Sequence, residues 1–379
     1  MSAEPALSFS RAEYDRRVAA VRDVMRARGV DLLVLDECEA LDYLFGTANT
    51  LNLYRAGILP LEGEPVMMPR QLDEAPFREA SWLTEFRPFA DWKDPVEHVC
   101  AVIAERGFAK ATIGMDYNSY AMGVRRFGQY QTLLSGARIV DFGNAINEIR
   151  LIKSAEEIDY LRRASTIADE AMRIAIAAVG VGGTERDAAT AASGAFVRLG
   201  ADNGACGPIT AGVGAGFLHG HLHDRPLVAH DVVHMELTPR INGYSARLMR
   251  PAVVGGATAR QQGAAEKLIE LQDAQIAAMK PGADARAVDA ILREGILKSG
   301  LRDRFDNLTG YTLGFYHRAG PRTSDFTRVF GPHVDYRLAA GMTFHMWVAA
   351  DGLAFSETVL VGAGGPERLT KIERKLFVR

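Results

Sequence analysis

The sequence of 379 residues has few cysteines and no long apolar run. Cys38, Cys100 and Cys206 are widely spaced, so they form neither a disulfide framework nor a zinc-binding spacing, which fits a reducing compartment. The amino-terminal stretch lacks the apolar core of a signal peptide, and no segment is apolar over the length needed to span a bilayer. We therefore expect a cytoplasmic protein with no membrane partner.

The sequence also lacks a large excess of either positive or negative charge. The formal net charge is -3, and acidic and basic residues do not gather in long runs, which argues against nucleic acid as a partner. A composition of 48% hydrophobic and 24% charged residues is that of an ordinary globular protein. The chain is long enough for two domains with separate cores.

The first part of the chain alternates between helix and strand patterns. Segment 11–30 is an amphipathic helix that ends at Gly29, and the apolar strand 31–36 follows it. Similar helix and strand patterns continue as far as the strand pattern at 137–143. This alternation predicts an α/β domain over residues 1–145.

Residues 146–379 have a different organisation. Ser154 and Glu157 form a capping box at the start of a long helix. Further helices are expected at 184–199, 258–279 and 284–298, with several strands between and after them. The pattern predicts an α+β domain around one curved antiparallel sheet.

A hairpin is predicted over residues 232–254, with Asn242-Gly243 as its turn. This turn places Glu236 opposite Met249 and makes Arg247 a diagonal neighbour of Glu236 on the same face. Two carboxylates at this spacing can share a divalent metal, whereas a carboxylate and a guanidinium cannot. The alternative is a structural ion pair, which contributes little on an exposed face, but the surrounding residues are largely apolar.

Three histidines alternate in the segment FLHGHLHDRPL, so His219, His221 and His223 share a face if the segment is extended. A metal site is one interpretation, but no acidic residue sits at strand spacing. His219 acting alone as an acid or base is favoured, since imidazole titrates near neutral pH.

Two more stretches contain candidate residues. Tyr311 can donate a hydrogen bond to developing charge, and His317 either contacts a substrate or faces water. His345 and Trp347 alternate along one strand and therefore share a face, while Glu357 lies on the next strand. Trp347 is either a core residue or part of a substrate-binding wall.

These stretches, in this order, resemble the pita-bread family of methionine and Xaa-Pro aminopeptidases, prolidase and creatinase. The resemblance covers AEYDRRVAAVRDVMRARGVDLLVL, EIRLIKSAEEIDYLRRA, HGHLHDRPL, the hairpin, GYTLG, GMTFH and SETVLV. It implies an α/β amino-terminal creatinase-type domain followed by an α+β pita-bread catalytic domain.

The peptidases of this family bind two metals through two Asp, one His and two Glu. The residues at these positions here are Glu236, Arg247, Tyr311, Trp347 and Ser356. The resemblance therefore implies no metal and no cofactor, and it is greatest to the metal-free branch, ectoine hydrolase and creatinase. His219 matches the active-site histidine of the family. The run FYHRAGPRTSDF departs from the Pro-Pro-x-Trp-Gly-Glu run of ectoine hydrolases, so the substrate is expected to differ.

The resemblance implies a metal-independent hydrolase of an amide, amidine or guanidine C–N bond in a small zwitterionic substrate. The expected catalytic residues are His219, Glu236, Arg247, Tyr311 and Glu357. The expected substrate-binding residues are Arg55, His223, Tyr244, His317, His345 and Trp347. A homodimer is also implied, in which the partner's amino-terminal domain closes the site.

Two alternatives stay open. The first is a catalytically silent binding domain, like the histone-chaperone members of the family, although the retained His219 and the polar replacements argue against it. The second is a mononuclear metal-dependent peptidase or lyase that uses Glu236, Glu357 and one histidine. A titration with chelator distinguishes the second alternative.

Overall fold

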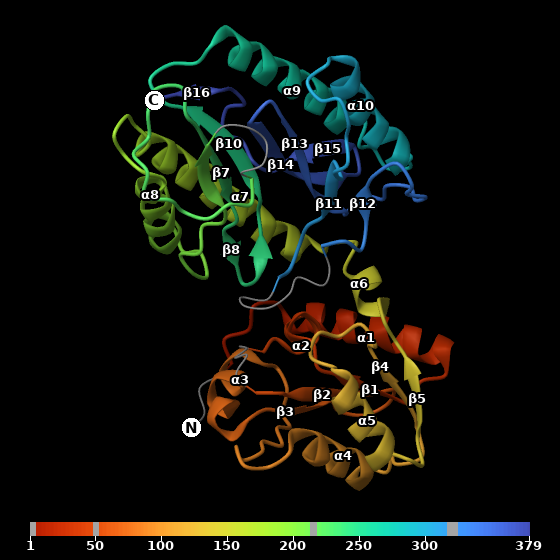
Figure 1. Ribbon diagram of the computed structural model, residues 1–379. Helices are drawn as coiled ribbons and strands as arrows, with labels where there is room; N and C mark the ends of the chain where they lie inside the picture. The colour runs from red at the N-terminus through yellow and green to blue at the C-terminus, as the bar shows by residue number, and fades with distance from the viewer. Residues whose placement is uncertain (1–4, 48–52, 213–217, 317–324) are drawn as a thin grey trace. The chain divides into compact units, whose positions relative to one another are not determined.

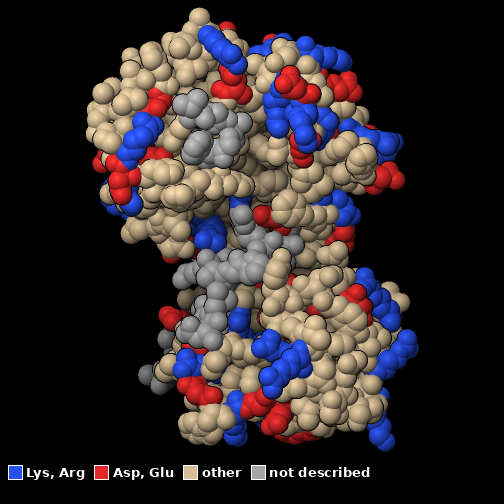
Figure 2. Space-filling view, in the orientation of Figure 1, with Lys and Arg blue, Asp and Glu red and all other residues tan. Residues whose placement is uncertain are grey.

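The computed structural model describes residues 5–47, 53–212, 218–316 and 325–379. The chain divides into two compact units, the first ending at Arg150 and the second beginning at Leu151, and each has its own sheet and core. Figure 2 shows acidic and basic side chains intermixed over the visible face of each unit. None of the described helices is both long and apolar enough to cross a membrane.

The first unit is an α/β domain of the creatinase type. Its elements are α1 (Arg11–Arg28), β1 (Leu32–Leu35), α2 (Cys38–Phe45), β2 (Ala56–Pro60), β3 (Val66–Met68), the 3-10 turn η1 (Gln71–Asp73), α3 (Glu74–Ala80), α4 (Pro95–Glu105), β4 (Thr112–Met115), α5 (Val124–Leu133), β5 (Arg138–Asp141) and α6 (Ala145–Ile149). The strand order is β3-β2-β1-β4-β5, with β1, β4 and β5 parallel and β2 antiparallel to β1. Figure 1 shows α1 and α2 on one face and α4 and α5 on the other.

Short-range chemistry explains where these helices begin and end. The Ser10 side chain accepts a hydrogen bond from the Glu13 amide at the start of α1, and Gly29 ends that helix in the left-handed conformation, as predicted. Asp94 caps α4, and Pro95 occupies its first position.

The second unit is an α+β domain with the pita-bread architecture. Its elements are α7 (Ala155–Ala177), α8 (Glu185–Arg198), β6 (Ile209–Gly212), β7 (Val232–Leu237), β8 (Arg240–Ile241), β9 (Tyr244–Ser245), β10 (Leu248–Val253), α9 (Ala259–Ala277), α10 (Ala285–Lys298), β11 (Gly310–Thr312), β12 (Val329–Phe330), β13 (Thr343–Ala350), β14 (Leu353–Gly362), β15 (Gly365–Arg368) and β16 (Phe377–Val378). The predicted capping box of Ser154 and Glu157 is present at the start of α7.

The expected single sheet is divided in two. One sheet has the order β16-β10-β7-β6 and the other β12-β11-β13-β14-β15, and the β10–β16 pair is parallel. The short strands β8 and β9 at the tip of the hairpin pair only with each other. Between the two sheets, the Arg247 amide donates to Thr358 Oγ1 at 2.8 Å and Thr358 Oγ1 donates to the Arg247 carbonyl at 3.0 Å. At this position the Thr358 side chain makes the hydrogen bonds that backbone groups of neighbouring strands make within a sheet.

Side-chain alternation gives each sheet two different faces. Val233 and Met235 of β7 pack into the core beneath α7 and α8, and Phe344 and Met346 of β13 pack into the core beneath α9 and α10 (Figure 1). The residues between them point to the opposite face. These are His234 and Glu236 on β7 and His345 and Trp347 on β13, and we call this side the site face.

The predicted hairpin is confirmed in register and turn. Ile241 pairs with Tyr244 and Glu236 pairs with Met249. Asn242 and Gly243 both have positive φ, 47° and 79°, as a two-residue hairpin turn requires.

Gly243 cannot accept a side chain without strain. A Cβ there would meet the Phe315 ring, and its φ of +79° favours glycine. We expect Gly243→Ala to lower the free energy of unfolding by about 1–3 kcal/mol. Gly263→Ala is the control, because an added methyl within α9 meets no atom, and it should raise stability by roughly 0.5–1 kcal/mol. Urea unfolding measures both, and equal effects would contradict the hairpin geometry.

Candidate active site

The centre of the site face is a buried pair formed by Glu236 and Arg247. Arg247 Nη1 donates to Glu236 Oε1 at 3.3 Å and also to the Tyr311 hydroxyl. Glu236 is 2% and Arg247 4% exposed. The predicted diagonal contact is therefore confirmed, and the interpretation as an exposed surface ion pair is wrong.

Further contacts fix the position of Arg247. The backbone amide and carbonyl of Arg247 are both hydrogen-bonded to Thr358 Oγ1, and the Arg247 Nη2 lies 3.9 Å from Asp325 Oδ2. The arginine thus lies between two carboxylates and a phenol, and burial keeps water from screening these interactions.

Burial and neighbouring charges set the ionisation of this group. Burial raises the pKa of Glu236, while Arg247 and His219 act in the opposite direction. Burial acts to lower the pKa of Arg247, but Tyr311 and Glu236 outweigh it and raise that pKa. Burial also raises the pKa of Tyr311. At neutral pH the site therefore contains a guanidinium cation and a protonated phenol.

Two neutral imidazoles share the site face. His345 is fully buried, its ring lies edge-on to Tyr311 at 5.1 Å between centroids, and burial together with Arg247 holds its pKa well below the usual range. Burial and His219 lower the pKa of His234 to about 4. The sequence analysis missed His234, although its place two residues before Glu236 on the same strand is a sufficient signal.

Trp347 and Ser356 are direct cross-strand neighbours on β13 and β14. Their side chains therefore lie next to each other on the site face. Trp347 packs against a small apolar cluster that contains Met249, the partner of Glu236 in the hairpin. The structure thus brings Trp347 together with Glu236, Arg247, Tyr311 and His345.

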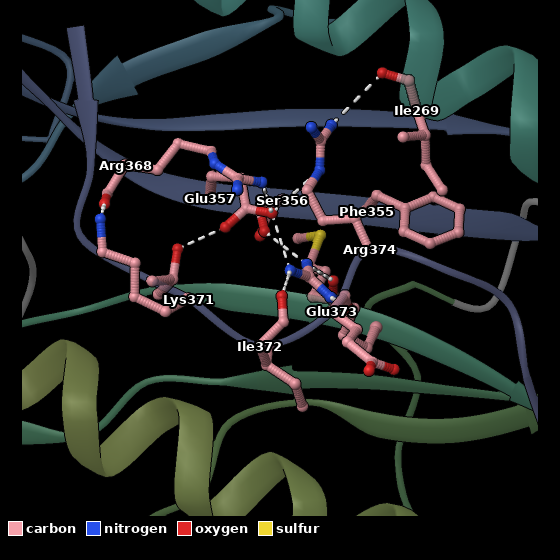
Figure 3. A network of polar contacts seen from close by, with 12 residues as sticks. Ile269, Phe355, Ser356, Glu357, Arg368, Lys371, Ile372, Glu373 and Arg374 are labelled. Atoms are coloured by element: carbon pink, nitrogen blue, oxygen red, sulfur yellow. Dashed lines mark hydrogen bonds and ion pairs between the residues drawn. The ribbon is translucent and has the colours of Figure 1, made fainter.

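Glu357 does not join this group, because its side chain points to the opposite face of β14 (Figure 3). Its Oε1 lies 2.7 Å from Arg250 Nη2 and 3.1 Å from Arg374 Nε, and its Oε2 accepts from Thr370. Arg250 and Glu357 are both fully buried. The geometry therefore corrects the assignment of Glu357 to the catalytic group.

Tyr244 is also separate from the site face. Its hydroxyl donates to Glu157 Oε1 at 2.8 Å, and its ring stacks on Tyr160 with 5.8 Å between centroids. These contacts hold the hairpin against α7, so the geometry corrects the assignment of Tyr244 to substrate binding.

The histidine segment is divided between two environments. His219 is exposed, yet its charge affects the pKa of both Glu236 and His234, so it acts within electrostatic range of the site. His223 Nδ1 lies 3.1 Å from Glu185 Oε1 at the start of α8, which gives it a structural contact.

Two predicted residues are not placed at this site by the structure. Arg55 belongs to the first unit, is 7% exposed, and donates to Cys38 Sγ. Its role in substrate binding stays a prediction. His317 lies outside the described residues.

The polar groups of the site face are a poor set of metal ligands. The guanidinium of Arg247 stands between the two carboxylates, Glu236 and Asp325, and the other groups on this face include a phenol, an indole and a hydroxyl. Among the described residues, no group of three or more His, Cys, Asp or Glu side chains is arranged to hold a metal ion.

Comparison with known proteins assigns both units. Residues 159–363 match the model of metallopeptidase family M24, and residues 17–152 match the creatinase/prolidase N-terminal domain. The chain is 27% identical to the ectoine hydrolase of Halomonas elongata, with 98% of this chain and 99% of that protein covered. It is 30% identical to the Xaa-Pro dipeptidase of Pyrococcus furiosus, with 70% and 75% covered. The prolidase structure from Pyrococcus horikoshii superposes with a TM-score of 0.80 at 20% identity, over 96% of this chain and 100% of that one, which shows a shared fold.

Removal of Glu357 should destabilise the fold. We expect Glu357→Ala to lower the free energy of unfolding by about 3–5 kcal/mol, because it leaves Arg250 buried without its carboxylate. Glu367→Ala removes an exposed ion pair with Arg162 and should change stability by less than about 1 kcal/mol. Chemical unfolding curves compare the two variants, and a mild effect of Glu357→Ala would argue against the structural assignment.

Proposed function

The chain belongs to metallopeptidase family M24 and is a hydrolase of that family, and we propose that it cleaves a C–N bond of a small zwitterionic molecule without a metal ion. The observation that carries this proposal is the buried Arg247, which is bonded to Glu236 and Tyr311 at once. A fixed cation there provides the positive charge that a hydrolytic site needs beside its carboxylate.

The residues present do not fit the metals that the family name implies. Arg247 is charged and lies within hydrogen-bonding distance of Glu236, so a divalent cation on that carboxylate would be repelled at close range. Tyr311, Trp347 and Ser356 line the same face and offer no carboxylate, and the Arg247 cation stands between Glu236 and Asp325. No catalytic step is therefore assigned to a metal.

The reaction is assigned to the protein's own side chains. Glu236 acts on the sp2 carbon, either by direct attack or by taking a proton from the attacking water. Water oxygen ends on the carbon, the C–N bond breaks, and His219 delivers a proton to the leaving nitrogen. The proton that the water gives up then restores His219. Arg247 orients the Glu236 carboxylate, and the Tyr311 hydroxyl stabilises charge that develops on the substrate.

The substrate class and assembly are part of the same proposal. The ectoine hydrolase relative, matched over nearly the full chain, supports a small zwitterionic substrate. We also propose a cytoplasmic homodimer in which the partner's amino-terminal domain, with Arg55, completes the site. The Xaa-Pro dipeptidase relative makes dipeptides the necessary comparison substrates in any screen.

The test begins with chelator-treated protein and a panel of cyclic amidines, lactams, guanidino acids and Xaa-Pro dipeptides, with mass spectrometry to detect turnover. In the active case, Glu236→Gln should lower kcat/KM by roughly a thousandfold or more, because the amide cannot act as nucleophile or base. Glu367→Gln, an exposed control, should retain full activity. Activity that appears only after divalent metal is added, or persists in Glu236→Gln, would reject the proposal.

The pH dependence of the rate provides a separate prediction. Glu236 must be ionised, so kcat/KM should fall as the pH drops through its pKa, which already lies above the ordinary value. Arg247→Met removes the charge that lowers this pKa and should move the acidic limb to higher pH. Arg247→Lys retains the charge and should move the limb less. An acidic limb that stays in place in Arg247→Met would contradict the role of Glu236.

A further inference from the structure

Several polar atoms on the site face are buried without a hydrogen-bond partner among the described residues. They are the indole Nε1 of Trp347, the hydroxyl oxygen of Ser356, the Nε of Arg247 and both ring nitrogens of His234 and of His345. Buried polar groups of a native protein are nearly always paired, so such a group needs an explanation. Because these atoms lie on one face of one pair of sheets, a bound ligand is a single explanation for them all.

Among these residues, Trp347 and Ser356 are direct neighbours on adjacent strands. They face each other across β13 and β14, at a spacing typical of about 4.5–5.5 Å between Cβ atoms. Ser356 is fully buried, and the indole Nε1 of Trp347 is inaccessible to water. The two side chains therefore form a small polar pair at one place on the site face.

This polar pair lies next to the reacting groups. Ser356 is two residues before Thr358, which holds the Arg247 backbone, so the two side chains are about 7 Å apart along the strand. Trp347 packs beside Met249, and Met249 is the direct partner of Glu236. A group bound by Trp347 and Ser356 is thus within one small molecule's length of the Glu236 carboxylate.

The chemistry of these groups limits the ligand. The indole N–H and the guanidinium N–H can only donate, and the serine hydroxyl can donate. One oxygen of the Glu236 carboxylate, Oε1, accepts from Arg247 Nη1. The indole N–H of Trp347 and the Nε–H of Arg247 therefore each need an acceptor, and a bound ligand can bring it. At the carbon that reacts, an amide presents an oxygen acceptor to these donors, whereas an amidinium or guanidinium presents only N–H donors.

We propose that the substrate is an amide, either open-chain or a lactam, and that Trp347 and Ser356 bind its carbonyl oxygen. When the nucleophile adds to the carbon, the C=O π electrons move onto the carbonyl oxygen, and they return when the C–N bond breaks. The two donors stabilise the charge that oxygen carries in between. This inference rests on the proposed function and narrows its range from amide, amidine or guanidine to amide.

A matched pair of ligands tests the inference by binding. The lactam 2-pyrrolidinone-5-carboxylate and its 2-imino analogue have the same ring and carboxylate, and they differ in a carbonyl oxygen against a protonated nitrogen. Calorimetry on chelator-treated full-length protein should show the lactam binding at least tenfold more tightly. Trp347→Phe, which retains an aromatic ring, and Ser356→Ala should each weaken lactam binding about tenfold and leave the imino analogue unchanged. Trp92→Phe, at an exposed tryptophan, is the control with no effect.

An NMR signal reports on the contact itself. The chain has three tryptophans, so the Trp347 indole N–H resonance is assigned by its loss in Trp347→Phe. That resonance should move downfield when the lactam binds and stay in place with the imino analogue. The inference is overturned if the lactam shows no saturable binding, if the imino analogue binds as tightly, or if both variants bind the lactam like the native protein.

The outcomes separate this inference from the proposed function. Lactam binding that depends on Trp347 and Ser356, without turnover of any amide, supports the amide subsite and counts against hydrolysis. Turnover of an amidine that depends on Glu236 retains the hydrolase and rejects the amide subsite.

Discussion

The buried ion pair between Arg250 and Glu357 decides which side chains reach the active site. Both residues are fully buried, and Arg250 also donates to the carbonyl oxygens of Met249 and Ser356, at 2.8 and 2.9 Å. The ion pair and the bond to the Ser356 carbonyl join β10 to β14 on the helix-facing side. A shift of β14 by one residue would remove the carboxylate from Arg250 and leave a buried cation unpaired. The ion pair therefore holds Ser356 on the site face.

A second arginine organises the opposite face. Arg247 stands on the site face, where it contacts Glu236, Tyr311 and the backbone-binding Thr358. The two cations are held by different means, since Arg250 is bound by one carboxylate together with backbone carbonyls, and the Arg247 guanidinium by side chains alone. A cation fixed in this way requires little reorganisation when charge develops on a substrate, which is the physical advantage of a preorganised site. The buried donors of Trp347 and Ser356, which have no partner among the described residues, lie on the same face.

Much of this arrangement follows from local sequence signals. The Asn242-Gly243 turn and the alternation of strand residues were sufficient to place Glu236 opposite Met249 and beside Arg247. The capping box at Ser154 and the end of α1 at Gly29 were likewise predictable, because each depends on a few neighbouring residues. The strand pattern in GMTFHMW also placed His345 and Trp347 on one face.

The sequence by itself determined the two domain types, the hairpin register and the pairing of a carboxylate with a guanidinium, since these depend on short-range turn chemistry and periodicity. Only the tertiary structure decided that Glu357 turns away from the site, that Tyr244 is bound to Glu157, and that Asp325 approaches Arg247. Each of these contacts joins segments far apart in the chain. The packing of the sheets and helices determines these partners, and no local sequence pattern indicates them.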